Sequence, residues 1–214
     1  MKTPEKQQAV LSSFDSSDEE SGEFDLSPLK ISWLDLSFLN CSAKFGVCAL
    51  PGCRFKDTWR SLENDIKGIT REEVTDIFCL CSKGELNKYR VPWLLHEMSA
   101  AEVTVHHHPF PDGQVPSFPL LMKIVDEIHS NLMNNKTSLI HCYGGLGRSC
   151  LVAACLLMVM DPGMEPDVAI QKVRDLRGHA AVQSVKQYNF IHEFRKSLEE
   201  YNKESEERRR SLSR

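Results

Sequence analysis

The chain has no apolar run long enough to cross a membrane and no excess of basic residues. Its longest apolar run, CLVAACLLMVM over Cys150–Met160, is shorter than the roughly 18–20 residues that a spanning helix needs. The 26 Lys and Arg face 30 Asp and Glu, for a formal net charge of −4. We therefore expect neither a membrane nor a nucleic acid as partner, and we expect a monomer.

The first residues, MKTPEKQQAVLSS, lack the apolar core of a secretory signal. We therefore expect a cytoplasmic location, with a perinuclear or nuclear one as the alternative. Cysteine is plentiful, but the C-x4-C pair of Cys48 and Cys53 and the C-x-C pair of Cys79 and Cys81 lack zinc-site spacing. In a reducing compartment most of these cysteines are expected to be buried small hydrophobes.

The three consecutive histidines at 106–108 also lack a metal-binding context in the sequence. In a strand, His106 and His108 would lie on one face, and no carboxylate or cysteine set stands near them in the chain. We therefore expect them to support the start of the loop that follows, and we predict neither a metal nor a cofactor.

The composition indicates one globular domain between two charged tails. Residues 1–28 contain the acidic segment FDSSDEESGEFD, which is too polar to offset the entropy of ordering, and are predicted to be a disordered tail. The domain is predicted over residues 29–201. Residues 202–214, which include KESEERRRSLSR, are predicted to be a charged and frayed C-terminal tail.

Between the tails, apolar runs alternate with helical periodicity. Strands are predicted over residues 30–37, 75–81, 102–109 and 137–141, and helices over 56–66, 117–132, 148–160, 166–177 and 184–200. This alternation predicts an α/β fold in which a central, mostly parallel sheet is flanked by helices in a single domain.

The stretch IHCYGGLGRSC, Ile140–Cys150, joins one of these strands to a helix through a loop rich in glycine. Such a loop turns backbone amides inward at a helix N-terminus and binds anions. It matches neither the G-x-x-x-x-G-K-[ST] nor the G-x-G-x-x-G pattern. Instead Cys142 opens it as a candidate nucleophile, and Arg148 closes it with a planar fork suited to two phosphate oxygens. The phosphate-binding residues between them are Tyr143, Gly144, Gly145, Leu146 and Gly147.

The pattern His141-Cys142-x5-Arg148-Ser149 resembles the signature of the cysteine-dependent protein tyrosine phosphatase superfamily. The resemblance implies that superfamily's fold and a phosphocysteine intermediate. It also implies that His141 hydrogen-bonds the loop and favours the thiolate, and that Ser149 donates a hydrogen bond to the departing sulfur.

A leaving oxyanion needs a proton donor. Asp112 is the one carboxylate in the turn-rich segment HHHPFPDG, thirty residues before Cys142. This segment resembles the acid loop of the superfamily, so Asp112 is predicted to be the general acid. Downstream, VQSVKQYNF resembles the family glutamine loop, which implies that Gln183 or Gln187 positions the hydrolytic water. The alternative is that both open an amphipathic helix.

Stretches outside the loop, among them CALPGCRFKD, GELNKYRVP and QYNFIHEFR, resemble the kinase-associated phosphatase family of dual-specificity phosphatases. The likeness implies removal of phosphate from the activation-loop threonine of a phosphorylated cyclin-dependent kinase. Cys81 is predicted to be a redox partner of Cys142, because related lipid phosphatases have a cysteine at the matching position. Two other readings remain: a phosphatase-like module that occludes a kinase without turnover, and a phosphatase of lipids or RNA 5′ ends. The uncharged loop weighs against the second.

Overall fold

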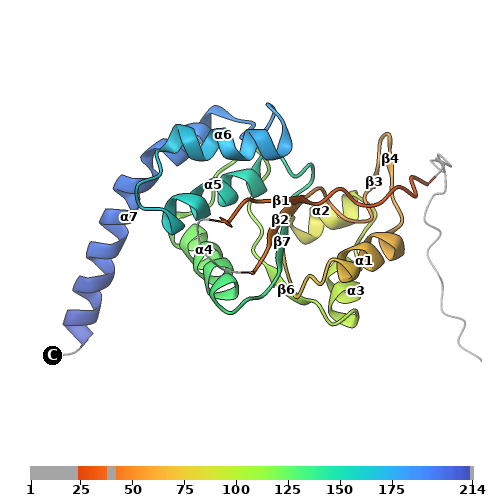
Figure 1. Ribbon diagram of the computed structural model, residues 1–214, viewed down its shortest axis with the longest axis horizontal. Helices are drawn as coiled ribbons and strands as arrows, with labels where there is room; N and C mark the ends of the chain where they lie inside the picture. Colours follow the sequence, from red (N-terminus) through yellow and green to blue (C-terminus); the bar gives the residue numbers. More distant parts are fainter. Residues whose placement is uncertain (1–23, 38–41, 213–214) are drawn as a thin grey trace, which may run out of the picture.

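The core of the protein is a five-stranded sheet, seen edge-on in Figure 1. The structure is a computed structural model and describes residues 24–37 and 42–212. The strand order is β1-β2-β7-β5-β6, with β7 in the middle. All neighbours pair in parallel except β1 and β2, so the prediction of a mostly parallel sheet is confirmed. The strands are β1 (Ser32–Trp33), β2 (Phe45–Cys48), β5 (Asp76–Cys79), β6 (Thr104–His107) and β7 (Ser138–His141).

Helices cover both faces of this sheet (Figure 1). One face carries α1 (Leu62–Arg71), α2 (Lys83–Lys88) and α3 (Leu94–Ala100). The other carries α4 (Phe118–Met133), α5 (Arg148–Met160), α6 (Pro166–Arg177) and α7 (Val185–Leu212). A separate two-stranded hairpin joins β3 (Arg54–Phe55) to β4 (Thr58–Trp59).

Each central strand supplies side chains to two separate cores. On β5, Phe78 packs towards α4 and α5, while its neighbours Ile77 and Cys79 pack towards α1, α2 and α3. On β7, Ile140 packs in the same core as Phe78, and Leu139 packs in the same core as Ile77 and Cys79. Strands buried on both faces have continuous apolar sequences, which is why these two runs are recognisable in the chain.

Helix α5 is the innermost helix, buried on every side from its first residue to Met158. It packs against α4, α6 and α7 as well as the sheet. A helix without a polar face is typical of a protein interior. The loop after β7 is therefore held between a central strand and a buried helix, and its two ends are fixed.

The region from Lys56 to Ile66 differs from its prediction as one helix. Lys56 adopts a left-handed backbone conformation (φ 52°) in the turn between β3 and β4, and α1 begins only at Leu62. The side chain of Ser61 caps α1 by accepting a hydrogen bond from the amide of Asn64 at 3.4 Å. The spacing of Trp59, Leu62 and Ile66 fits one face of a helix, but Trp59 lies in strand β4 and only Leu62 and Ile66 lie in α1.

The structure describes parts of both predicted tails. Arg60 pairs with Asp25 at 2.8 Å, so residues just before position 29 already pack on the domain; residues 1–23 lie outside the described part of the chain. Helix α7 continues past Tyr201 to Leu212. Ion pairs at i,i+4 spacing, such as Glu204 with Arg208, support this exposed extension. Within the described residues, no helix is both long and apolar enough to span a bilayer.

Candidate active site

The cysteine loop lies at the C-terminal end of β7, the central strand, and leads into α5. This is where open parallel sheets usually bind ligands, and the N-terminus of α5 favours negative charge. The predicted loop residues from His141 to Ser149 are therefore brought together at one position in the fold.

The conformation of Gly145 and the side chain of Arg177 shape the cysteine loop. Gly145 adopts a left-handed conformation (φ 67°), and a Cβ placed there would lie 2.4 Å from the carbonyl oxygen of Cys48. Arg177 of α6 donates from Nε to the carbonyl of Gly145 at 3.0 Å and from Nη2 to that of Gly144 at 3.2 Å. Because these carbonyls are bound outside the loop, the amides are free to face an anion.

Substituting Gly145 by Ala is expected to lower the free energy of unfolding by at least about 1–2 kcal/mol, because an alanine in this conformation is strained even before the clash with Cys48. The matched control is Gly144→Ala, whose Cβ would meet only the tip of Leu146, at 3.9 Å. Urea unfolding of both variants measures the difference. Equal stability of the two would contradict this account of the loop.

Cys142 is almost fully buried at the mouth of the loop, with 2% of its surface exposed. Its Sγ lies 3.3 Å from the hydroxyl oxygen of Ser149 in the first turn of α5. The ring of His141 is buried, and its Nδ1 lies 3.3 Å from the carbonyl oxygen of Cys142. The predicted contacts of His141 with the loop backbone and of Ser149 with the sulfur are therefore present.

Arg148 is fully buried and shared among several elements. Nη1 donates to the carbonyls of Leu80 at 2.9 Å and Phe110 at 3.0 Å, and both terminal nitrogens bind the carboxylate of Glu85. Nε lies 3.2 Å from Oδ1 of Asp112 but without hydrogen-bond geometry, so among the described residues this N–H has no acceptor. A buried and unused donor beside the loop is available for a phosphate oxygen.

Glu85 was not identified from the sequence, although its motif is visible there. Ser82 and Glu85 form a capping box that starts α2: Ser82 Oγ accepts from the amide of Glu85 at 3.2 Å, and Glu85 Oε2 accepts from the amide of Ser82 at 2.8 Å. The same carboxylate binds Arg148, with Oε1 2.7 Å from Nη2. Partial burial raises the pKa of Glu85, but the bonds from Arg148 and Ser82 outweigh this effect and lower it below 4.5.

Glu85→Gln is expected to lower the free energy of unfolding at pH 7 by about 3 kcal/mol, because it leaves the Arg148 charge buried without its partner. Since the pKa of Glu85 is depressed by folding, its stabilisation is complete above 4.5 and is lost as the pH falls through the folded pKa. The difference between wild type and variant should therefore shrink in acid, as urea titrations at several pH values can measure. A difference that stays constant down to the lowest pH would contradict this role.

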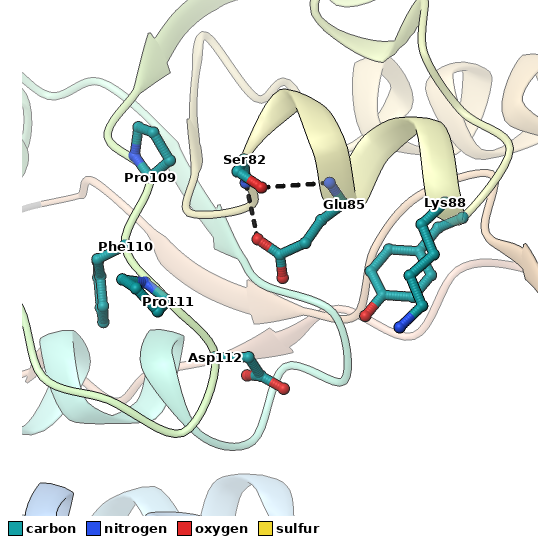
Figure 2. A pocket seen from close by; sticks show the side chains of 8 residues that line it. Ser82, Glu85, Lys88, Pro109, Phe110, Pro111 and Asp112 are labelled. Atoms are coloured by element: carbon teal, nitrogen blue, oxygen red, sulfur yellow. Dashed lines mark hydrogen bonds between the residues drawn. The ribbon is translucent and has the colours of Figure 1, made fainter.

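Asp112 lies opposite Glu85 across a hollow of about 560 Å³. Figure 2 shows the two carboxylates entering this hollow from different elements, Glu85 from α2 and Asp112 from the loop after β6. The side chain of Asp112 is 54% exposed, so it can reach a substrate, while Phe110 of the same loop is buried and anchors it. The structure thus places the predicted acid beside Arg148, the arginine predicted to bind phosphate.

The two predicted glutamines also reach the site. A Cβ on Gly147 would lie 2.8 Å from Oε1 of Gln183 and 3.2 Å from Nε2 of Gln187, so both amides face the cysteine loop. Gln187 is fully buried and donates from Nε2 to the carbonyl of Gln114 at 3.3 Å. Ser184 donates to the carbonyl of Gly113 at 3.0 Å, which links the glutamine loop to the acid loop.

Cys81 follows β5 next to the cysteine loop. Cys79 of β5 pairs with His141 of β7, so the segments that follow these two strands also lie side by side. Cys81 Sγ lies 4.0 Å from Nη2 of Arg148. A hydrogen bond with Cys79, together with burial, raises the pKa of Cys81, so it is a protonated thiol. The seven cysteines that the structure describes are all free and buried, as predicted for most of them.

Comparison with known proteins is consistent with this geometry. Residues 1–170 match the family model of cyclin-dependent kinase inhibitor 3 (CDKN3). The chain is 48% identical over 214 residues, all of both proteins, to cyclin-dependent kinase inhibitor 3 of Rattus norvegicus and likewise to that of Homo sapiens. The chain belongs to the cyclin-dependent kinase inhibitor 3 family.

Solved structures agree with the family assignment. A crystal structure of kinase associated phosphatase, whose catalytic site cysteine is replaced by serine, has a TM-score of 0.78 and 48% identity, covering 81% of this chain and 98% of that one. PTPMT1, at 19% identity and a TM-score of 0.63, covers 82% of this chain and 99% of its own and shares the fold. As a member of the inhibitor 3 family, the protein is a cysteine-dependent, dual-specificity phosphatase of the protein tyrosine phosphatase superfamily.

Proposed function

We propose that this protein removes phosphate from the activation-loop threonine of a cyclin-dependent kinase and so acts as a negative regulator of the cell cycle. The chemistry is supported by one observation above all: Asp112 Oδ1 lies 3.2 Å from Nε of Arg148, beside the loop that Cys142 opens. The kinase substrate is supported by the names of the relatives, cyclin-dependent kinase inhibitor 3 and kinase associated phosphatase.

The reaction has two steps. The thiolate of Cys142 attacks phosphorus, and the S–P bond forms as the P–O bond to the substrate breaks. Asp112 gives its proton to the leaving oxygen, while the loop amides and the free Nε–H of Arg148 bind the phosphoryl oxygens.

In the second step Asp112, now a carboxylate, takes a proton from water as that water attacks the phosphocysteine. The amides of Gln183 and Gln187 face the loop and orient this water. The S–P bond breaks, and Ser149, 3.3 Å from Sγ, donates a hydrogen bond to the departing thiolate. Inorganic phosphate is released and the enzyme returns to its initial state.

The test is phosphate release from a purified cyclin-dependent kinase phosphorylated on its activation-loop threonine, with no added metal, beside a generic phosphotyrosine peptide. Release from the kinase that is rapid and depends on Cys142 supports both chemistry and substrate. Release from the peptide alone would support the phosphatase chemistry and contradict the proposal that the kinase is the substrate. Tight binding of the kinase without any release would instead favour the occluding module.

We also propose that Cys81 traps the oxidised form of Cys142. Peroxide converts the Cys142 thiolate to a sulfenic acid, and the neighbouring thiol of Cys81 displaces water from it to form a disulfide. Peptide mapping after brief peroxide treatment should find the 81–142 disulfide, and activity should return with dithiothreitol. In Cys81→Ser, recovery should be largely lost; sulfinic acid at Cys142 as the sole product in wild type would contradict this proposal.

A further inference from the structure

The structure brings together a cluster that does not belong to the phosphatase site. The side chains of His106 and His108 project from the same side of β6 and its continuation, as their spacing predicts, with ring centroids 6.4 Å apart. The sequence places no carboxylate set close to them in the chain, but the fold brings Glu127 of α4 against both. Its Oε2 lies 3.0 Å from Nδ1 of His106 and 2.7 Å from Nε2 of His108.

We propose that His106, His108 and Glu127 form a binding site for a divalent transition-metal ion, with Zn²⁺ as the best match. Two imidazole nitrogens and a carboxylate oxygen are donors that this ion accepts. The three donor atoms all lie within 4.8 Å of one another. In a tetrahedral site with bonds of about 2.0–2.1 Å, donors stand roughly 3.3 Å apart, so only small side-chain movements are required.

The second nitrogen of His106 points to the same conclusion. Its Nε2 lies 2.8 Å from Oδ1 of Asp76, a carboxylate that is itself 1% exposed. This contact fixes the ring of His106 so that its other nitrogen, Nδ1, faces Glu127.

A metal-binding histidine uses one ring nitrogen for the ion and the other for a hydrogen bond to a supporting group. In His106, Nδ1 faces Oε2 of Glu127 at 3.0 Å while Nε2 faces Asp76. Nε2 of His108 converges on the same glutamate oxygen at 2.7 Å, so one ion could contact all three donor atoms. A carboxylate behind a metal-binding histidine, as Asp76 stands behind His106, is the usual support of such a ligand.

The surroundings are compatible with entry and release of an ion. His106 stacks on Phe78 at 4.2 Å between centroids, which fixes its ring, while Glu127 keeps 29% of its side chain exposed. The exposed side leaves room for water as a fourth ligand. Since His108 directly precedes the acid loop that carries Asp112, the ion would join α4 to the start of that loop.

Calorimetric titration with Zn²⁺ tests the site in the full chain carrying Cys142→Ser, which removes the catalytic thiolate as a competing ligand. One ion per chain is expected to bind. Glu127→Gln, which retains size and hydrogen bonding, and His108→Gln should each weaken binding by at least about tenfold. The matched control is His96→Gln, which alters an exposed histidine that also lies next to a glutamate, with Nδ1 3.3 Å from Oε1 of Glu97.

Co²⁺ provides a second readout. Binding at this site should give a visible ligand-field band without the thiolate charge-transfer band in the near ultraviolet, and Glu127→Gln should remove it. Zn²⁺ affinity that is unchanged in Glu127→Gln, a thiolate band with Co²⁺, or no binding by the parent chain would each overturn the proposal. In the last case protons alone would hold the cluster. If His108→Gln fails to fold, the result with Glu127→Gln decides, because Glu127 is only partly buried.

Discussion

Cys142→Ser is expected to release no measurable phosphate from either a phosphothreonine or a phosphotyrosine substrate. Serine is close to cysteine in size and fits the same buried position beside Ser149. Its hydroxyl is a far weaker nucleophile than a thiolate. Loss of the nucleophile in another covalent hydrolase reduces turnover by roughly 10⁶-fold, and a comparable fall is expected here. Phosphate release under single-turnover conditions measures it.

The same variant should still bind the phosphorylated substrate, because Arg148 and the loop amides are unchanged. Cys155→Ala is the matched control: it removes another buried thiol, about two turns into α5, and should keep its activity. Phosphate release by Cys142→Ser above the rate measured without enzyme would contradict the assignment of Cys142 as nucleophile.

Asp112→Asn is expected to slow release from phosphothreonine by about 10²–10⁴-fold, the range that general acid catalysis contributes. The alkoxide of threonine is a poor leaving group and depends on the proton, whereas nitrophenolate from p-nitrophenyl phosphate does not. The loss should therefore be much smaller with p-nitrophenyl phosphate. Since Asp112 is more than half exposed, the variant is expected to fold normally.

Asp57→Asn is the control for charge alone. Asp57 is exposed in the turn between β3 and β4, and its charge acts on Tyr143 of the cysteine loop. Removing that charge should leave the dependence on the leaving group unchanged. Equal losses for both substrates in Asp112→Asn would mean that this aspartate does not donate the proton.

The sequence predicted those parts of the site that are contiguous or follow a local rule. The cysteine, the loop glycines and the arginine lie within eleven residues, and the strand and helix on either side are apolar runs. Asp112 was predictable because the cysteine loop calls for a proton donor and the turn-rich segment that carries this aspartate resembles the acid loop of the superfamily. The short elements were harder to predict: β2 has four residues and α2 has six, too few for a period to show.

Contacts between distant positions could not be predicted in this way. Glu85 binds Arg148 across 63 positions, and Arg177 holds the carbonyl of Gly145 across 32. Glu127 joins the histidines only because α4 packs beside β6. Each of these side chains has an ordinary local explanation as a cap or a charged helix position, so its second role depends on the fold.

The hydrogen bonds between the start of α7 and the acid loop have a consequence for how the two loops move. Ser184 and Gln187 bind the carbonyls of Gly113 and Gln114, the two residues after Asp112. The predicted acid loop and the predicted glutamine loop are therefore joined by direct hydrogen bonds. We expect a displacement of one loop to displace the other, so that the proposed proton donor and the proposed water-positioning groups change position together.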